Sequence, residues 1–146
     1  MSRPARPGPR SERDFVLEDD GSGRAADLGE KTLARLRRGL PAPEFELDLH
    51  GLDAREAARL VQRELEQARA DGVRCVRIVH GRGLHSASGP VLREQLPRWL
   101  TAGPLADAVL AFTRSPALRD AGGSTLVLLR RSGRGRAEAG RSGHAD

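Results

Sequence analysis

The chain has 146 residues, of which 38% are hydrophobic and 3% aromatic, enough for one domain with a modest core rich in Leu, Val and Ala, plus tails. Its first ten residues alternate Arg and Pro, unlike a signal peptide, and no segment has the length of a membrane span, so we expect a soluble, cytoplasmic protein. Cys75 is the single cysteine, which excludes a disulfide framework and a cysteine-based zinc site.

The formal charge of +5 is unevenly distributed along the chain. Residues 47–131 carry thirteen Arg against nine acidic residues, whereas residues 1–46 carry nine residues of each sign. Lys31 is the only lysine among the 25 basic residues. Guanidinium groups bind phosphate in bidentate geometry, so this bias favours an anionic partner. A genome rich in G and C explains the same bias equally well.

Composition divides the chain into four segments. Residues 1–27 are rich in Pro, Gly and charge, which predicts a disordered N-terminal tail. Residues 28–44 are expected to form a helix, capped by Asp27, and a linker. The folded domain is expected over residues 45–131, followed by a disordered basic tail over residues 132–146.

The expected domain begins with strict alternation of apolar and polar residues over residues 45–50, which predicts a strand with one buried face. Asp53 is the expected N-cap of a helix that runs to about Ala70. Further elements are a strand over residues 73–79, a helix over 90–100, and strands over 108–112 and 125–130. The β-α-β-α-β-β order predicts a two-layer α/β sandwich, in which a four-stranded mixed sheet carries both helices on one face and its first two strands are parallel.

Each of the first two strands ends in His-Gly, at His50 and His80. Because the carboxyl ends of parallel strands lie at the same edge of a sheet, both histidines should lie at one site. Asp48 precedes His50 by two residues, so its carboxylate could accept a hydrogen bond from that imidazole and raise its basicity. We therefore predict Asp48, His50 and His80 as catalytic residues. The alternative is a structural Asp–His pair at a strand end.

The loop after the second strand is suited to phosphate binding. Gly81 and Gly83 allow close approach of the backbone to a ligand, and Arg82 adds charged donors between them. Ser86 and Ser88 add hydroxyls at the expected helix N-terminus, where an anion is favoured. We predict these five residues as a nucleic-acid-binding loop, although the H-G-x-G pattern alone is common in turns.

Three segments together resemble the Smr (small MutS-related) family: L-D-L-H-G-L over residues 47–52, H-G-R-G over 80–83, and Gly122-Gly123 before the final strand. The resemblance covers about residues 45–131 and is strongest to small stand-alone bacterial members. It implies a fold similar to the C-terminal domain of translation initiation factor three. It also implies cleavage of RNA or nicking of DNA, and for some members action on mRNA at stalled ribosomes. Arg82 stands where the family often has Lys.

For an RNA substrate, we favour transesterification without a metal, with His50 as base, His80 as acid or phosphate contact, and Arg82 stabilising charge on the phosphate. DNA lacks the 2′-hydroxyl, so its cleavage would need a divalent metal ion. Asp48 and Glu46 would be the only ligands for that ion, which is few for a metal site. We thus expect no cofactor and no metal, and RNA as substrate. The remaining alternative is a non-catalytic module that binds RNA or the ribosome. We expect a monomer with no membrane partner.

Overall fold

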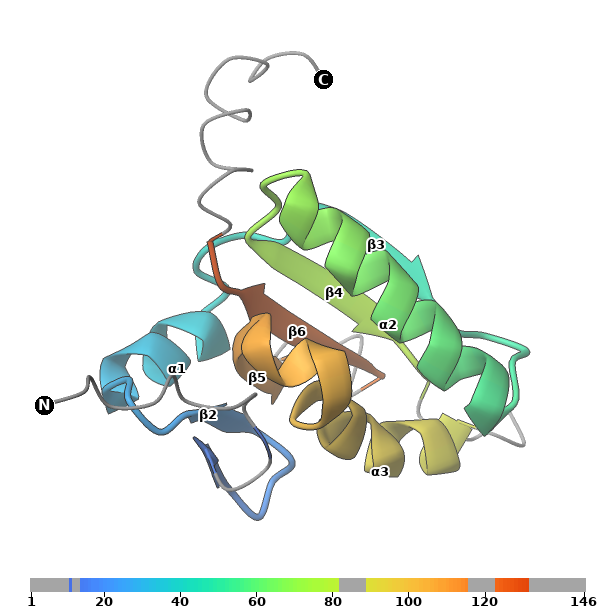
Figure 1. The fold of residues 1–146 in the computed structure, drawn as a ribbon. Helices are drawn as coiled ribbons and strands as arrows, with labels where there is room; N and C mark the ends of the chain where they lie inside the picture. The colour runs from blue at the N-terminus through green and yellow to red at the C-terminus, as the bar shows by residue number, and fades with distance from the viewer. Residues whose placement is uncertain (1–10, 12–13, 82–88, 116–122, 132–146) are drawn as a thin grey trace, which may run out of the picture.

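The computed structural model describes residues 11, 14–81, 89–115 and 123–131, which form one six-stranded sheet flanked by helices (Figure 1). The strands are β1 (Phe15–Leu17), β2 (Gly23–Ala25), β3 (Phe45–Asp48), β4 (Cys75–Val79), β5 (Val109–Arg114) and β6 (Ser124–Leu129). The helices are α1 (Glu30–Arg37), α2 (Ala54–Ala70), α3 (Gly89–Leu100) and a short 3-10 helix (Gly103–Asp107). Within these described residues, no helix is both long and apolar enough to cross a bilayer.

The sheet is mixed, with the strand order β1-β2-β5-β6-β4-β3. The neighbours β3 and β4 are parallel, as expected for strands joined by a helical crossover, and all other neighbouring pairs are antiparallel. Asp48 at the end of β3 lies opposite Val79 at the end of β4. The predicted parallel pair is therefore confirmed, and its two carboxyl ends lie side by side.

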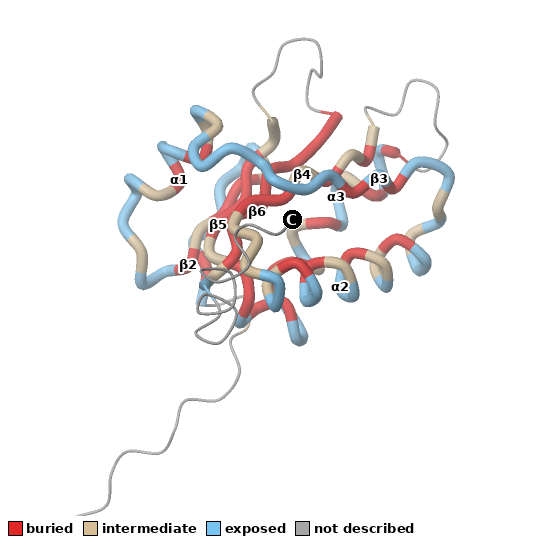
Figure 2. Tube along the Cα trace, turned by 90° about the horizontal axis from the view of Figure 1, so that it is seen from above, coloured by how far each residue is buried: buried red, intermediate tan, exposed pale blue. Residues whose placement is uncertain are grey.

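The main core lies between the sheet and the pair α2 and α3. Its buried residues include Val61 and Leu65 of α2, Leu92 and Leu96 of α3, and Ile78 of β4. Both helices thus cover one face of the sheet, as the sequence predicts. The other face is partly covered by α1, so that the sheet lies between α1 and α2 in Figure 2 and the expected two layers become three.

The second core cluster joins α1 to the sheet. Leu33 and Leu36 of α1 pack against Cys75, Leu126 and Leu128, together with Ala111. This helix begins at Glu30 with Gly29 at its N-cap, not at Leu28 with Asp27 as the cap. Cys75 is buried there as a small apolar side chain, and burial raises the pKa of its thiol to about 11.

The N-terminal hairpin is the main correction to the predicted fold. Residues 14–27 are part of the expected tail, yet they form β1 and β2, which extend the sheet from four strands to six. Phe15 and Ala25 are buried, and Gly23 packs so closely that a Cβ there would lie 2.7 Å from Cζ of Phe112. Residues 1–10, 12–13 and 132–146 of the two predicted tails lie outside the described residues.

The start of α2 is fixed by a capping box. The Asp53 side chain accepts a hydrogen bond from the Glu56 N–H at 2.8 Å, and the Glu56 carboxylate accepts one from the Asp53 N–H at 3.0 Å. The cap that the sequence predicts is therefore confirmed. It holds the first turn of α2 directly after the segment His50–Gly51, and so sets where the helix leaves the sheet edge.

Candidate nucleic-acid site

The carboxyl ends of β3 and β4 and the start of β6 meet at one edge of the sheet. The Leu49 N–H donates to the Val79 carbonyl at 2.8 Å, which continues the parallel pairing beyond β3. The N–H groups of His80 and Gly81 both donate to the Gly123 carbonyl, at 3.0 and 2.9 Å. The two His-Gly pairs and the glycine before the last strand are therefore brought together at this edge, as their sequence positions predict.

Asp48 organises the turn that presents His50. Its Oδ1 accepts a hydrogen bond from the main-chain N–H of His50 at 2.9 Å, rather than from the imidazole. The expected carboxylate–imidazole pair is therefore corrected: the Asp48 carboxylate binds the His50 main chain in a local turn, although the alternation of buried and exposed residues continues through His50. Gly51 follows with φ +83°, a conformation that glycine adopts without strain. His50 is exposed beside this turn.

His80 is buried, with 2% of its surface exposed. Its Nε2 lies 2.9 Å from the Thr125 hydroxyl, and its Nδ1 lies 3.1 Å from the Gly81 carbonyl oxygen. A carbonyl only accepts, so these contacts assign the proton to Nδ1 and make Nε2 the acceptor from Thr125. Thr125 shares a face of β6 with Val127, on the core side of the sheet. His80 thus links β4 to β6 beneath the surface, on the opposite face from Asp48.

Gly81 is the one member of the predicted binding loop within the described residues. Its φ is +85°, and nothing lies within 4 Å of the position that a Cβ would occupy, so the backbone conformation rather than crowding requires glycine. Arg82, Gly83, Ser86 and Ser88 lie in the segment 82–88, outside the described residues. Their assignment to nucleic-acid binding stays a prediction from the sequence.

Comparison with known protein families identifies the family of this chain. The model of the Smr domain matches residues 47–130, more than half of the chain. The chain belongs to the Smr family. The matched Smr segment lies inside the domain expected over residues 45–131 and contains both His-Gly pairs.

Named Smr relatives include two bacterial ribosome rescue factors. SmrB of Aliivibrio fischeri (strain MJ11) is 33% identical over 116 residues, which are 78% of this chain and 61% of the relative. SmrB of Vibrio cholerae serotype O1 is 35% identical over 115 residues, which are 77% of this chain and 58% of the relative. The chain therefore spans about three fifths of the length of these relatives.

One solved Smr structure is similar in fold. It is that of YdaL, a stand-alone small MutS-related protein from Escherichia coli, with a TM-score of 0.59 and 30% identity. The similarity covers 75% of this chain and 82% of YdaL.

Sequence reasoning missed Arg77, which lies near the Smr site on the outer face of β4. Its Nε donates to the buried Ser124 hydroxyl at 3.0 Å, and its position in the sheet is opposite Glu46. A charged residue in the centre of the run C-V-R-I-V was the available signal. Arg77 and Glu46 are neighbours in the sheet, so the Glu46 carboxylate, which the sequence offers as a second metal ligand beside Asp48, lies next to a positive charge. Among the described residues, no group of three or more His, Cys, Asp or Glu could hold a metal ion.

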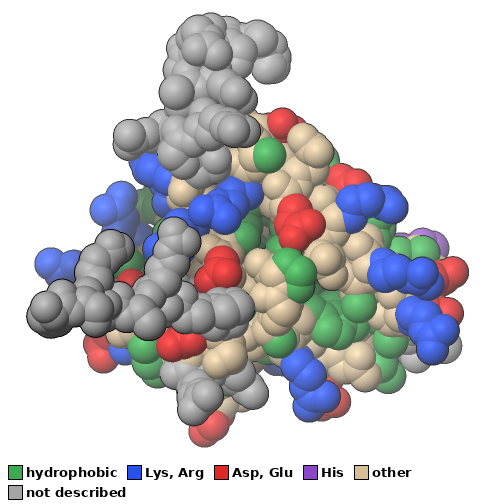
Figure 3. Space-filling view, in the orientation of Figure 1, with side chains coloured by type: hydrophobic (Ala, Val, Ile, Leu, Met, Phe, Trp, Pro, Cys, Tyr) green, Lys and Arg blue, Asp and Glu red, His purple; other side chains and the backbone are tan. Residues whose placement is uncertain are grey.

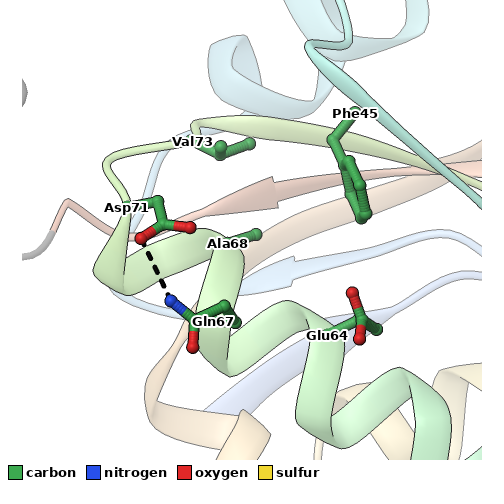
Figure 4. Close-up of a pocket in the computed structure, with 6 residues that line it drawn as sticks. All are labelled: Phe45, Glu64, Gln67, Ala68, Asp71 and Val73. Carbon is green, nitrogen blue, oxygen red and sulfur yellow. Dashed lines mark hydrogen bonds between the residues drawn. The ribbon is translucent and has the colours of Figure 1, made fainter. Parts of the chain in front are cut away.

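A pocket lies at the other end of β3 (Figure 4). Phe45 points toward the C-terminal turns of α2, where Glu64, Ala68 and Asp71 also line the pocket. Phe45 is 38% exposed, so it is only partly in the buried face predicted for β3, whereas Leu47 and Leu49 are buried. The pocket is separated from Asp48 and His50 by the length of the strand.

Proposed function

We propose that this chain is an Smr-type endoribonuclease that cleaves mRNA on ribosomes in the cytoplasm. Relatives named as ribosome rescue factors and the excess of arginine over acidic residues in the domain support an RNA substrate. The observation that carries the proposal is the turn at the end of β3, where Asp48 fixes the backbone and leaves the His50 side chain exposed next to the start of the Gly81 loop.

In the proposed reaction, His50 accepts the proton of a ribose 2′-hydroxyl. The 2′-oxygen forms a bond to the adjacent phosphorus, and the bond from phosphorus to the 5′-oxygen breaks. That oxygen takes a proton from water, and the hydroxide so formed takes the proton from His50. The products are a 2′,3′-cyclic phosphate and a 5′-hydroxyl end. Arg82 and the loop amides stabilise charge on the phosphate. His80 is buried, so we assign it the role of a positioning residue that holds Gly81, rather than that of the acid or phosphate contact expected from the sequence.

The test is cleavage of 5′-labelled RNA by the purified chain, with and without EDTA. His50→Ala should lower the rate about 10²–10⁴-fold, the usual contribution of a general base, while binding is retained. Asp48→Asn should lose less than Asp48→Ala, because an amide oxygen can still accept the His50 N–H. His144→Ala, in the C-terminal tail, is the matched control and should cut at the wild-type rate.

The outcomes separate the alternatives from one another. Inhibition by EDTA together with nicking of DNA would replace the proposal by the metal-dependent DNA nuclease. Tight RNA binding without cleavage by the wild-type chain would replace it by the non-catalytic binding module. If the His50→Ala variant folds and cuts at the wild-type rate, the assignment of His50 as base is wrong.

A further inference from the structure

Three arginines form a row along the outer side of α2. Arg55, Arg59 and Arg63 are all exposed and stand four residues apart. Residues at this spacing lie above one another on an α-helix, and eight residues rise by about 12 Å. Figure 3 shows Lys and Arg side chains following one another over α2, on the side of the molecule where histidine is visible. The row is therefore a continuous cationic strip on the protein surface.

This strip works against the stability of the helix that carries it. Like charges at a spacing of four residues repel one another, and Arg55 lies in the first turn, where the helix dipole disfavours a cation. Nearby Asp53 and Glu56 are engaged in the capping box. Of the three arginines, only Arg63 has a carboxylate within ion-pair distance among the described residues, Glu64 at 3.6 Å, and its side chain is still 72% exposed.

The strip begins beside the candidate site. Because α2 starts at Ala54, four residues after His50, and its first turn is held by the capping box, Arg55 is anchored close to the end of β3. From there the row runs along the outer helical layer. A nucleic-acid strand with one phosphate at His50 can thus continue over α2 without crossing the buried part of the fold.

We propose that Arg55, Arg59 and Arg63 bind the sugar–phosphate backbone of the RNA that flanks the cleaved bond. At about 3.4 Å per nucleotide of a stacked strand, a row of about 12 Å covers three to four nucleotides. Guanidinium groups contact phosphate oxygens and not base edges, so the strip adds affinity without sequence preference. This inference rests on the proposed function, and it assigns α2 as a surface that positions the substrate.

The experiment measures RNA binding in the His50→Ala background, so that the RNA stays intact. The variant with Arg55→Gln, Arg59→Gln and Arg63→Gln is compared with a control that carries Arg35→Gln, Arg38→Gln and Arg131→Gln. Both lose three exposed positive charges, but the control positions lie on α1, at its C-cap and after β6. Because the α2 variant removes two repulsive pairs, its melting temperature should not fall.

The α2 variant should bind a twelve-nucleotide RNA roughly tenfold or more weakly at low salt, and its salt slope should fall by about 2, since each phosphate contact to a single strand contributes about 0.7. The loss should shrink for a three-nucleotide RNA, and the control should bind like the unsubstituted protein. The inference is overturned if the α2 variant keeps its affinity and slope, if the control loses as much, or if the strip binds anionic vesicles but not RNA. If the unsubstituted chain neither binds nor cuts RNA, the proposed function itself fails.

Discussion

The contribution of the hydrogen bond between His80 and Thr125 to stability can be measured with the substitution Thr125→Val. The two side chains are 2% and 5% exposed, and the bond is 2.9 Å long. Valine keeps the shape of threonine but replaces the hydroxyl with a methyl group, which deprives the His80 Nε2 of this partner. Removing one partner of a buried hydrogen bond lowers the free energy of unfolding by about 1–3 kcal/mol. For a domain of this size, that loss corresponds to a melting temperature lower by about 4–12 °C.

Urea unfolding followed by circular dichroism measures the loss, and an unchanged m-value shows that the folded and unfolded states are otherwise comparable. Thr113→Val is the matched control, because Thr113 is equally buried on β5 but its hydroxyl makes no hydrogen bond to His80 in the structure. A cycle with His80→Ala should give a coupling of at least about 0.5 kcal/mol. If Thr125→Val is as stable as the parent, or if the two substitutions are additive, His80 does not hold β4 to β6.

Three further predictions concern other parts of the fold. Asp53→Ala should cost about 0.5–2 kcal/mol in urea unfolding, because both halves of the capping box depend on it, and Asp53→Ser should restore most of that loss. Gly23→Val should expose the hairpin to limited proteolysis, since a Cβ would lie 2.7 Å from Phe112 and 2.8 Å from Leu17; unchanged protection would contradict the close packing. Burial raises the pKa of Cys75 from 9.0 to about 11, so the neutral thiol favours the folded state. The resulting stability is present below about pH 9 and should fall by about 2–3 kcal/mol as the pH rises to 11, at 1.36 kcal/mol per unit, and Cys75→Ala should abolish this dependence.

Elements with local signals were predictable from the sequence. The bounds of α2 follow from its cap at Asp53 and from Gly72 after its last turn, both of which act within a few residues. The segment Gly23–Ala25 has no such signal, because its residues favour no strand by themselves. It is a strand because the edge of β5 offers it hydrogen-bonding partners far along the chain.

In the candidate site, too, the location could be predicted from the sequence, whereas the side-chain contacts could not. The crossover rule places the two His-Gly pairs at one edge, and the structure confirms that location. The direction of each side chain depends on details that alternation does not contain. The Asp48 carboxylate accepts from the His50 main-chain N–H rather than from the imidazole, and the His80 ring contacts Thr125, which lies 45 residues further along the chain.

The N-terminal hairpin and α1 lie outside the Smr match, which begins at residue 47. They nevertheless cover two parts of the matched segment that would otherwise be exposed, the edge of β5 and an apolar patch on the sheet. A fragment cut at that boundary would leave β5 as a bare edge strand and would expose the apolar side chains of Cys75, Leu126 and Leu128 beneath α1. Open strand edges and apolar patches of this kind promote aggregation. The segment before residue 47 therefore shields the matched segment from aggregation. The smallest fragment of this chain that stays free of aggregation should begin before Phe15 rather than at the family boundary.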